Sequence, residues 1–180
     1  MVEDFEDASD VWSFSAGGAT LTKEAVAGAV GNGIRVKYEV VTGSSAGIIK
    51  SVVDIQNGNW SEFSGVEVRI KSELAKPMRI VLVERGKKNK TEAGEQWEYA
   101  FTPKQSWTVY AVPFSQFVKD AKWQPEDQDN NGGLTLDGLL QLNITPDAPD
   151  RKFKKYGDTI VVDELRLMRG GSATASGSGE

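Results

Sequence analysis

The sequence predicts an all-β protein, and three observations lead to this fold class. Short segments in which apolar and polar residues alternate recur about every 8–12 residues, which is typical of a β-sandwich. Clusters of Gly, Asn and Asp separate these segments and mark turns. No long amphipathic helical pattern interrupts the series. Because 180 residues can bury a substantial core, we expect one sandwich domain.

The individual strands follow from side-chain periodicity. In residues 34–41, Ile34, Val36, Tyr38 and Val40 occupy every second position, as in a strand with one buried face. The same reasoning predicts further strands in residues 66–71, 78–83, 97–101, 107–112, 139–144 and 159–167. A short helical turn is expected at residues 115–118.

For two of these strands, the sequence also predicts the environment of each face. The segment 78–83 is apolar except for Arg79, which indicates a central strand that is covered on both faces. In the segment 139–144 and just beyond it, Gln141, Asn143 and Thr145 share one face, opposite Leu and Ile side chains. A row of uncharged hydrogen-bonding groups suits sugar hydroxyls, although an ordinary solvent-facing strand is the alternative.

Composition excludes several kinds of chemistry. The chain has no Cys and no His, which removes disulfides, thiolate nucleophiles and the Ser-His-Asp triad. The net charge of -5 argues against nucleic acid, and no apolar run is long enough for a membrane helix. Acid pairs such as Glu95 with Glu98, or Asp127 with Asp129, could serve a glycosidase, but no feature marks either pair as convergent. We therefore expect no enzyme.

The tryptophans divide into two groups. Trp60, Trp97 and Trp107 fall at apolar positions of the pattern, so we expect them in the core. Trp123 instead lies in a polar segment that begins at Lys122, where a large aromatic side chain has no evident packing role. Because flat aromatic rings stack on the apolar faces of sugars, Trp123 is the first candidate for a ligand contact.

Several segments of this sequence resemble those of one known family. In order and spacing, the segments 2–6, 31–38, 94–99, 112–117 and 160–167 are similar to those of the family 11 carbohydrate-binding modules. These modules are β-glucan-binding jelly rolls attached to bacterial cellulases. The resemblance covers residues from about Val2 to about Met168. It implies a galactose-binding-like jelly roll in residues 1–169, followed by a flexible Gly/Ser-rich linker in residues 170–180.

The resemblance also implies a function. We expect a non-catalytic, extracellular and monomeric module that binds β-1,4- or mixed-linkage β-1,3-1,4-glucan, or cellulose. It would keep a tethered glycoside hydrolase, as part of a larger endoglucanase, near its substrate, with no nucleic-acid or membrane partner. The same fold outline also serves protein-interaction and assembly domains, which we retain as the alternative.

The family's contact positions transfer to particular residues. Its Trp-Gly-Ser-Tyr-Ser motif corresponds to residues 12–15 with an offset of one, so that Phe14 takes a tyrosine position. Its Asp-Tyr-Gln-Pro motif corresponds to residues 122–125, where Trp123 takes another. Asp120 and Lys122 supply a polar pair, and the face of the 139–144 strand adds Gln141 and Asn143. Family aromatic residues are replaced at three positions, Ser45, Ala46 and Pro146.

A structural calcium ion is the one cofactor that we expect. The resemblance implies such an ion near the joined first and last strands of the jelly roll. The candidate oxygen ligands are Glu6, Asn32 and Asp163, and main-chain carbonyl groups would complete the coordination shell.

Overall fold

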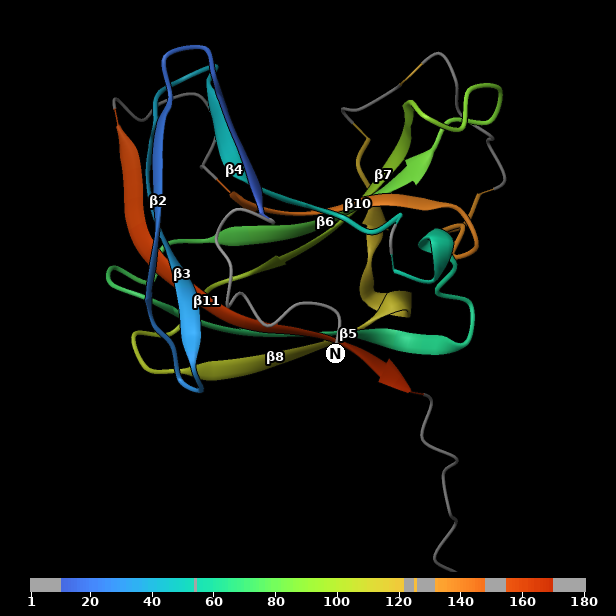
Figure 1. The fold of residues 1–180 in the computed structure, drawn as a ribbon. Helices are drawn as coiled ribbons and strands as arrows, with labels where there is room; N and C mark the ends of the chain where they lie inside the picture. Colours follow the sequence, from blue (N-terminus) through green and yellow to red (C-terminus); the bar gives the residue numbers. More distant parts are fainter. Residues whose placement is uncertain (1–10, 54, 122–124, 126–131, 148–154, 170–180) are drawn as a thin grey trace, which may run out of the picture.

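The protein, seen here in a computed structural model, is a sandwich of two antiparallel sheets (Figure 1). The structure describes residues 11–53, 55–121, 125, 132–147 and 155–169. A six-stranded sheet has the order β1-β4-β10-β6-β7-β9, and a five-stranded sheet has the order β2-β3-β11-β5-β8. The expected all-β sandwich is confirmed.

The bounds of the strands show which segments each sheet uses. The six-stranded sheet contains β1 (Trp12–Ala16), β4 (Ser45–Ser51), β6 (Met78–Arg85), β7 (Ala93–Phe101), β9 (Val118–Lys119) and β10 (Leu139–Pro146). The five-stranded sheet contains β2 (Thr20–Ala27), β3 (Asn32–Val40), β5 (Phe63–Ser72), β8 (Thr108–Pro113) and β11 (Tyr156–Arg169).

All seven strands expected from periodicity are present, as β3, β5, β6, β7, β8, β10 and β11. The expected helical turn is a 3-10 helix at Phe114–Gln116, which begins one residue earlier than residues 115–118. A second 3-10 helix spans Gln56–Gly58. Each of these two helices has three residues, so neither described helix is long enough to cross a membrane.

The core lies between the sheets and consists of the inward residues of the alternating strands. Trp60 is fully buried there and its ring stacks on that of Phe114 at a centroid distance of 6.3 Å. Trp97 is also a core residue. The expectation for Trp107 was wrong: its ring is half-buried outside the core cluster, and the Lys71 ammonium group lies 4.7 Å from its centre.

Two tyrosines connect the core to the end of the sandwich where β10 and β11 meet the β5–β6 connection. The Tyr38 hydroxyl lies 3.2 Å from the Met78 sulfur, and the Tyr156 hydroxyl donates a hydrogen bond to the Pro77 carbonyl. Burial raises the pKa of both hydroxyls, that of Tyr156 to about 12. Both side chains are therefore neutral packing groups near neutral pH.

Candidate functional site

The outer face of the six-stranded sheet gathers polar and aromatic side chains from five of its six strands, β1, β4, β10, β6 and β7. Residues that pair directly in an antiparallel sheet point to the same side, so the register shows which side chains share this face. One row crosses the whole sheet, and we call it the central row: Trp12, Ile49, Asn143, Val81, Glu98 and Val118.

Exposure is lowest in the middle of the central row. The exposed fraction falls from 70% at Trp12 to 6% at Val81, and rises again to 61% at Val118. Although Val81 is buried, it does not belong to the core cluster between the sheets, as expected for the outer face. In Figure 1, β4 rises on one side of β6 and β10, and the end of β7 rises on the other. We call this curved surface the trough.

The floor of the trough contains buried polar atoms that lack partners. Asn143 Oδ1 and Thr145 Oγ1 are inaccessible to solvent, and neither has a hydrogen-bond partner in the described part of the chain. Gln141 lies on the same face of β10, two residues before Asn143, and is half-buried. An unsatisfied buried polar group costs about 1–3 kcal/mol, so a side-chain rotation that brought either oxygen to a ligand hydroxyl would be favoured.

Charged side chains occupy the neighbouring strands of the trough. Arg79 of β6 pairs with Thr145 of β10 in the register, so it lies on the same face. Its Nη1 atom lies 2.5 Å from Glu98 Oε2, and its Nε atom lies 3.6 Å from Asp147 Oδ1. These groups are about one quarter to two fifths exposed, so they can still reach a ligand from the trough.

Phe14 lies on the β1 side of the trough. It pairs with Gly47 of β4, and a Cβ atom on Gly47 would stand 2.9 Å from Phe14 Cε1 and 2.7 Å from Thr145 Cγ2. Glycine at position 47 therefore leaves the room in which the Phe14 ring lies beside Thr145. The side chain of Phe14 remains half-buried.

The structure brings three of the predicted sugar-contact residues together: Phe14, Gln141 and Asn143 share the trough. Asp120 directly follows β9, and its main-chain N–H donates to the carbonyl of Gln96, which lies on the same sheet. Lys122 and Trp123 lie outside the described residues, so their roles stay predictions.

The replaced family aromatics do not all belong to this face. Ser45 pairs with Ala16 and lies on the outer face, whereas Ala46 is buried in the core. Pro146 pairs with the core residue Met78, so it does not face outward. The outward residue at the end of β10 is its neighbour Thr145. Only the replacement at Ser45 thus removes a side chain from the trough.

The sequence marked Thr145 on this face, but it did not mark three other residues of the trough as contacts: Trp12, Arg79 and Glu98. The isolated Arg79 in an otherwise apolar strand was a usable signal, because a lone charge on a covered strand needs a polar environment. Glu98 was considered only as the partner of Glu95. The two acids lie on opposite faces of β7, where Glu95 is 1% exposed and contacts Lys119, so they are not a convergent pair.

A second cluster of oxygen atoms lies at the β2–β3 turn. Asp163 is fully buried on β11; its Oδ2 accepts hydrogen bonds from the N–H groups of Ala29 (2.8 Å) and Val30 (3.0 Å). Its Oδ1 atom has no hydrogen-bond partner among the described residues. Both Oδ1 and the main-chain oxygen of Asn32 lie 2.9 Å from the point where a Cβ of Gly28 would stand.

These oxygens fit a calcium ion in kind, because Ca²⁺ prefers carboxylate and carbonyl oxygen ligands. Asn32 offers its main-chain carbonyl at this point, and the predicted ligand Glu6 lies outside the described residues. No group of three or more acidic side chains that could hold a metal gathers within the described ranges.

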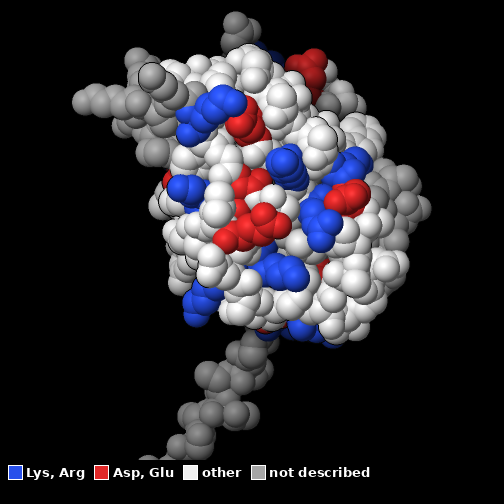
Figure 2. All heavy atoms as spheres, turned by 90° about the vertical axis from the view of Figure 1, so that its left-hand side faces the viewer, with Lys and Arg blue, Asp and Glu red and all other residues white. Residues whose placement is uncertain are grey.

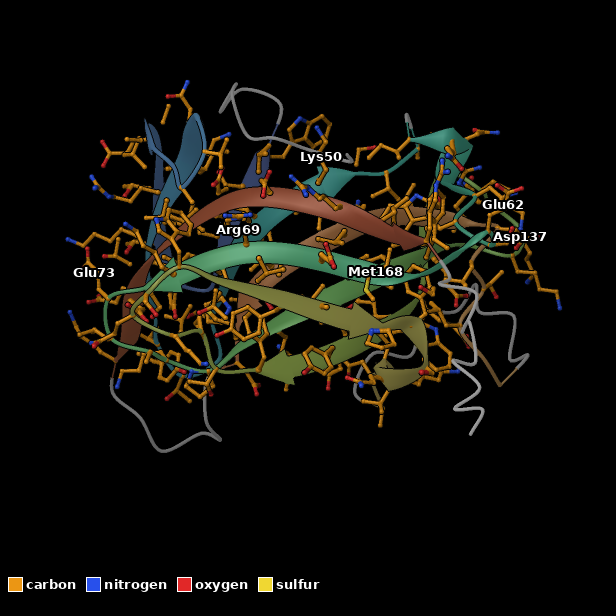
Figure 3. The ribbon with its side chains drawn as sticks, turned by 90° about the horizontal axis from the view of Figure 1, so that it is seen from below. Lys50, Glu62, Arg69, Glu73, Asp137 and Met168 are labelled. Carbon is orange, nitrogen blue, oxygen red and sulfur yellow. The ribbon has the colours of Figure 1, made fainter. Side chains whose placement is uncertain are left out.

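The opposite face of the sandwich has a different character. Figure 2 shows basic and acidic side chains interleaved over the side formed by β2 and β3. In Figure 3, Arg69 lies between β5 and β11 on the outer face of the five-stranded sheet. Its Nε atom lies 2.9 Å from Glu164, which also contacts Arg166. Paired charges of this kind neutralise each other, so the trough is the better candidate for a ligand site.

Comparison with known proteins identifies the class of domain to which this sandwich belongs. Residues 1–158 match the model of a carbohydrate binding domain. The chain belongs to family 11 of these domains, as its sequence phrases predicted. Over 170 residues it is 35% identical to Endoglucanase H of Acetivibrio thermocellus, a match that covers 93% of this chain and 18% of that protein. The chain therefore spans less than a fifth of this relative.

Solved structures agree with the fold. The family 11 module of the cellulosomal cellulase Lic26A-Cel5E of Clostridium thermocellum superposes with a TM-score of 0.83 at 30% identity, and 94% of each chain is covered. A family 11 module from Clostridium thermocellum in complex with a β-1,3-1,4-mixed-linked tetrasaccharide gives a TM-score of 0.82 at 31% identity. That match covers 93% of this chain and 94% of the other.

Proposed function

We propose that this chain is a non-catalytic module that binds β-1,4- or mixed-linkage β-1,3-1,4-glucan in the trough. The observation that carries the proposal is a pair of buried side-chain oxygens on this face, Asn143 Oδ1 and Thr145 Oγ1, which have no hydrogen-bond partner among the described residues. The relative solved with a mixed-linkage tetrasaccharide supports the choice of ligand.

Two kinds of contact would hold the glucan. The ring of Phe14 offers an apolar surface for a pyranose face, and Gln141 and Asn143 offer hydrogen bonds to equatorial hydroxyls. Arg79 and Glu98 provide planar polar groups at the next two strands. Binding must offset the ordering of a flexible chain, so we expect dissociation constants in the micromolar range or weaker.

The remaining predicted contacts fit the same proposal. Asp120 follows the short edge strand β9 and is half-buried at the end of the trough opposite to β1. Lys122 and Trp123 come directly after it in the sequence. We propose that these three residues form the β9 side of the binding site.

The test is affinity electrophoresis through gels that contain barley β-glucan, hydroxyethylcellulose or xylan, together with pull-down on insoluble cellulose. The wild type should be retarded by β-glucan, and Asn143→Ala should lose most of the retardation. Leu74→Ala is the matched control, because Leu74 is exposed in the β5–β6 connection, away from the trough. If the folded wild type is not retarded in any gel and does not bind cellulose, the glucan proposal fails and protein partners become the better alternative.

We further propose that the module acts as part of a larger extracellular endoglucanase. The supporting observations are its match to a small part of an endoglucanase and its likeness to a module of a cellulosomal cellulase. On this proposal, residues 1–169 bind the glucan as a monomer, and the linker of residues 170–180 keeps a hydrolase at high effective concentration near the polymer. The rate of hydrolysis can be compared between the hydrolase joined to this module and the two domains separated. The difference should be larger for insoluble glucan than for soluble oligosaccharides.

We also propose a structural calcium ion at Asp163. Two observations support this site: the buried Oδ1 atom has no hydrogen-bond partner in the described ranges, and the carbonyl of Asn32 lies nearby. Glu6 is the third proposed ligand. An ion bound only by the folded state raises the melting temperature. Calcium should therefore stabilise the wild type relative to protein in EGTA, with a binding signal in calorimetry.

The variant Asp163→Asn distinguishes the role of Asp163 in binding the ion from its role in holding the β2–β3 turn. The amide oxygen can still accept the N–H groups of Ala29 and Val30, but the charge that favours Ca²⁺ is lost. This variant should fold and lose the calcium response. A wild type whose melting temperature is the same in calcium and in EGTA, with no calorimetric signal, would refute the calcium site.

A further inference from the structure

Trp12 is the most exposed large apolar side chain on the trough. Its exposed fraction is 70%, whereas Phe14, two residues later on the same face of β1, is half-buried. Tryptophan is usually well buried in folded proteins, because its indole ring carries the largest apolar surface of any side chain. An indole that is exposed on a polar sheet face is therefore available for stacking on a ligand.

The register places Trp12 in line with the polar floor. It is the first residue of the central row, and this row then crosses Ile49, Asn143 and Val81. Adjacent strands lie about 4.8 Å apart, so Trp12 is about 10 Å from Asn143 and about 14 Å from Val81 along the row. A sugar chain that crosses the strands over Asn143 would reach the indole only if it extends beyond the middle of the trough.

Trp12 also occupies the side of the trough where another aromatic is missing. With Phe14 aligned on the tyrosine of the Trp-Gly-Ser-Tyr-Ser motif, Trp12 falls on the glycine of that motif. Ser45, which replaces a family aromatic, pairs with Ala16 at the other end of β1. Four residues along a strand correspond to about 13 Å, so Trp12 lies about that far along β1 from the residue that pairs with Ser45.

We propose that Trp12 forms an additional sugar-stacking subsite at the β1 end of the trough, which selects longer β-glucan chains. The inference rests on the proposed glucan-binding function and assigns a chain-length preference to the same site. Sugars over β10, β6 and β7 would meet the polar floor, and the indole would stack on a further ring at the end of the central row. Short oligosaccharides would occupy the floor without reaching Trp12.

The experiment compares a mixed-linkage β-1,3-1,4-tetrasaccharide with the corresponding hexasaccharide by calorimetry. Wild type should bind the hexasaccharide about five- to tenfold more tightly, the gain expected for one aromatic stacking contact. Trp12→Ala should remove this gain and leave the tetrasaccharide affinity within about twofold of the wild type. Leu74→Ala, which removes an exposed apolar side chain elsewhere, should keep the gain.

A measurement on the unaltered protein gives an independent test. The indole N–H signal of Trp12 can be identified in NMR spectra by its loss in Trp12→Phe. In the wild type this signal should shift with the hexasaccharide and stay in place with the tetrasaccharide. This result does not depend on how well Trp12→Ala folds.

The possible outcomes separate the two proposals. If the wild type binds neither oligosaccharide nor barley β-glucan, the proposed function itself fails. If both oligosaccharides bind and Trp12→Ala binds them as the wild type does, with no shift of the indole signal, only the Trp12 subsite is refuted. An equal loss for both ligands would place Trp12 in the central site and would also overturn the chain-length inference.

Discussion

Gly47 shows how a single position shapes the trough. Its missing side chain leaves space that is bordered by Phe14, Thr145 and the carbonyl of Ile144, each within 2.9 Å of an ideal Cβ. Two of these three neighbours face the trough, and the third is main chain that cannot rotate away. The position of the Phe14 ring beside Thr145 therefore depends on the absence of one methyl group.

Gly47→Ala should consequently reduce both stability and binding. Overpacking at a site that can relax only by moving backbone typically costs about 1–3 kcal/mol of unfolding free energy. The displaced Phe14 ring should also weaken glucan retention. Urea denaturation measures the first effect and affinity electrophoresis measures the second. Gly133→Ala is the control, because a Cβ at Gly133 meets no atom within 4 Å. Equal denaturation midpoints for the two variants would contradict this account of Gly47.

At the scale of elements, the connection between β5 and β6 is held by one buried carboxylate. Asp158 of β11 accepts hydrogen bonds from the Ser72 hydroxyl (2.5 Å) and from the N–H groups of Leu74 (2.9 Å) and Lys76 (3.1 Å). The Thr159 N–H donates to the same side chain at 2.7 Å. One side chain of the last strand thus fixes a turn that lies more than eighty residues earlier in the sequence.

Removal of that carboxylate should loosen the turn and destabilise the sandwich. Asp158→Ala leaves several buried donors without an acceptor, so we expect a loss of about 2–4 kcal/mol in the free energy of unfolding. Amide hydrogen exchange at Leu74 and Lys76 should become faster. Glu62→Ala removes an exposed carboxylate and should change neither quantity. Unchanged exchange at the two amides in Asp158→Ala would show that another contact holds the turn.

The elements also show where prediction from sequence succeeds. Strands with strong alternation, such as β3 and β5, were predicted because one face is core and the other is solvent. The segments of β1, β2, β4 and β9 were not: β1, β2 and β9 are edge strands that bury few residues, and in β4 the neighbouring Ile48 and Ile49 break the alternation.

The same limit applies to the candidate site. The polar face of β10 could be predicted from the sequence, because Gln141 and Asn143 alternate with core residues within one strand. The association of Trp12 with Asn143 and Glu98 was not, because it depends on the pairing of strands that are far apart in the sequence. Local periodicity gives the face of each strand, but the order of strands in the sheet decides which faces meet.

At the scale of the whole molecule, the two outer faces differ in the side chains that they present. The five-stranded sheet presents charges that pair with each other, as Arg69 and Glu164 do, and Figure 2 shows both signs interleaved over β2 and β3. The trough on the six-stranded sheet instead combines uncharged hydrogen-bonding groups, aromatic rings and one Arg79–Glu98 pair. A neutral ligand suits such a face better than a charged one.

Binding to β-glucan should therefore depend little on ionic strength. A neutral polysaccharide releases no counterions, and salt screens mainly exposed charges. We expect the dissociation constant for barley β-glucan to change by less than about twofold between about 0.02 and about 0.5 M NaCl, as measured by calorimetry. An anionic polymer attracted to the basic side chains would lose affinity steeply over the same range. A steep loss for β-glucan would mean that charge, and not the uncharged groups around Asn143, dominates recognition by this module.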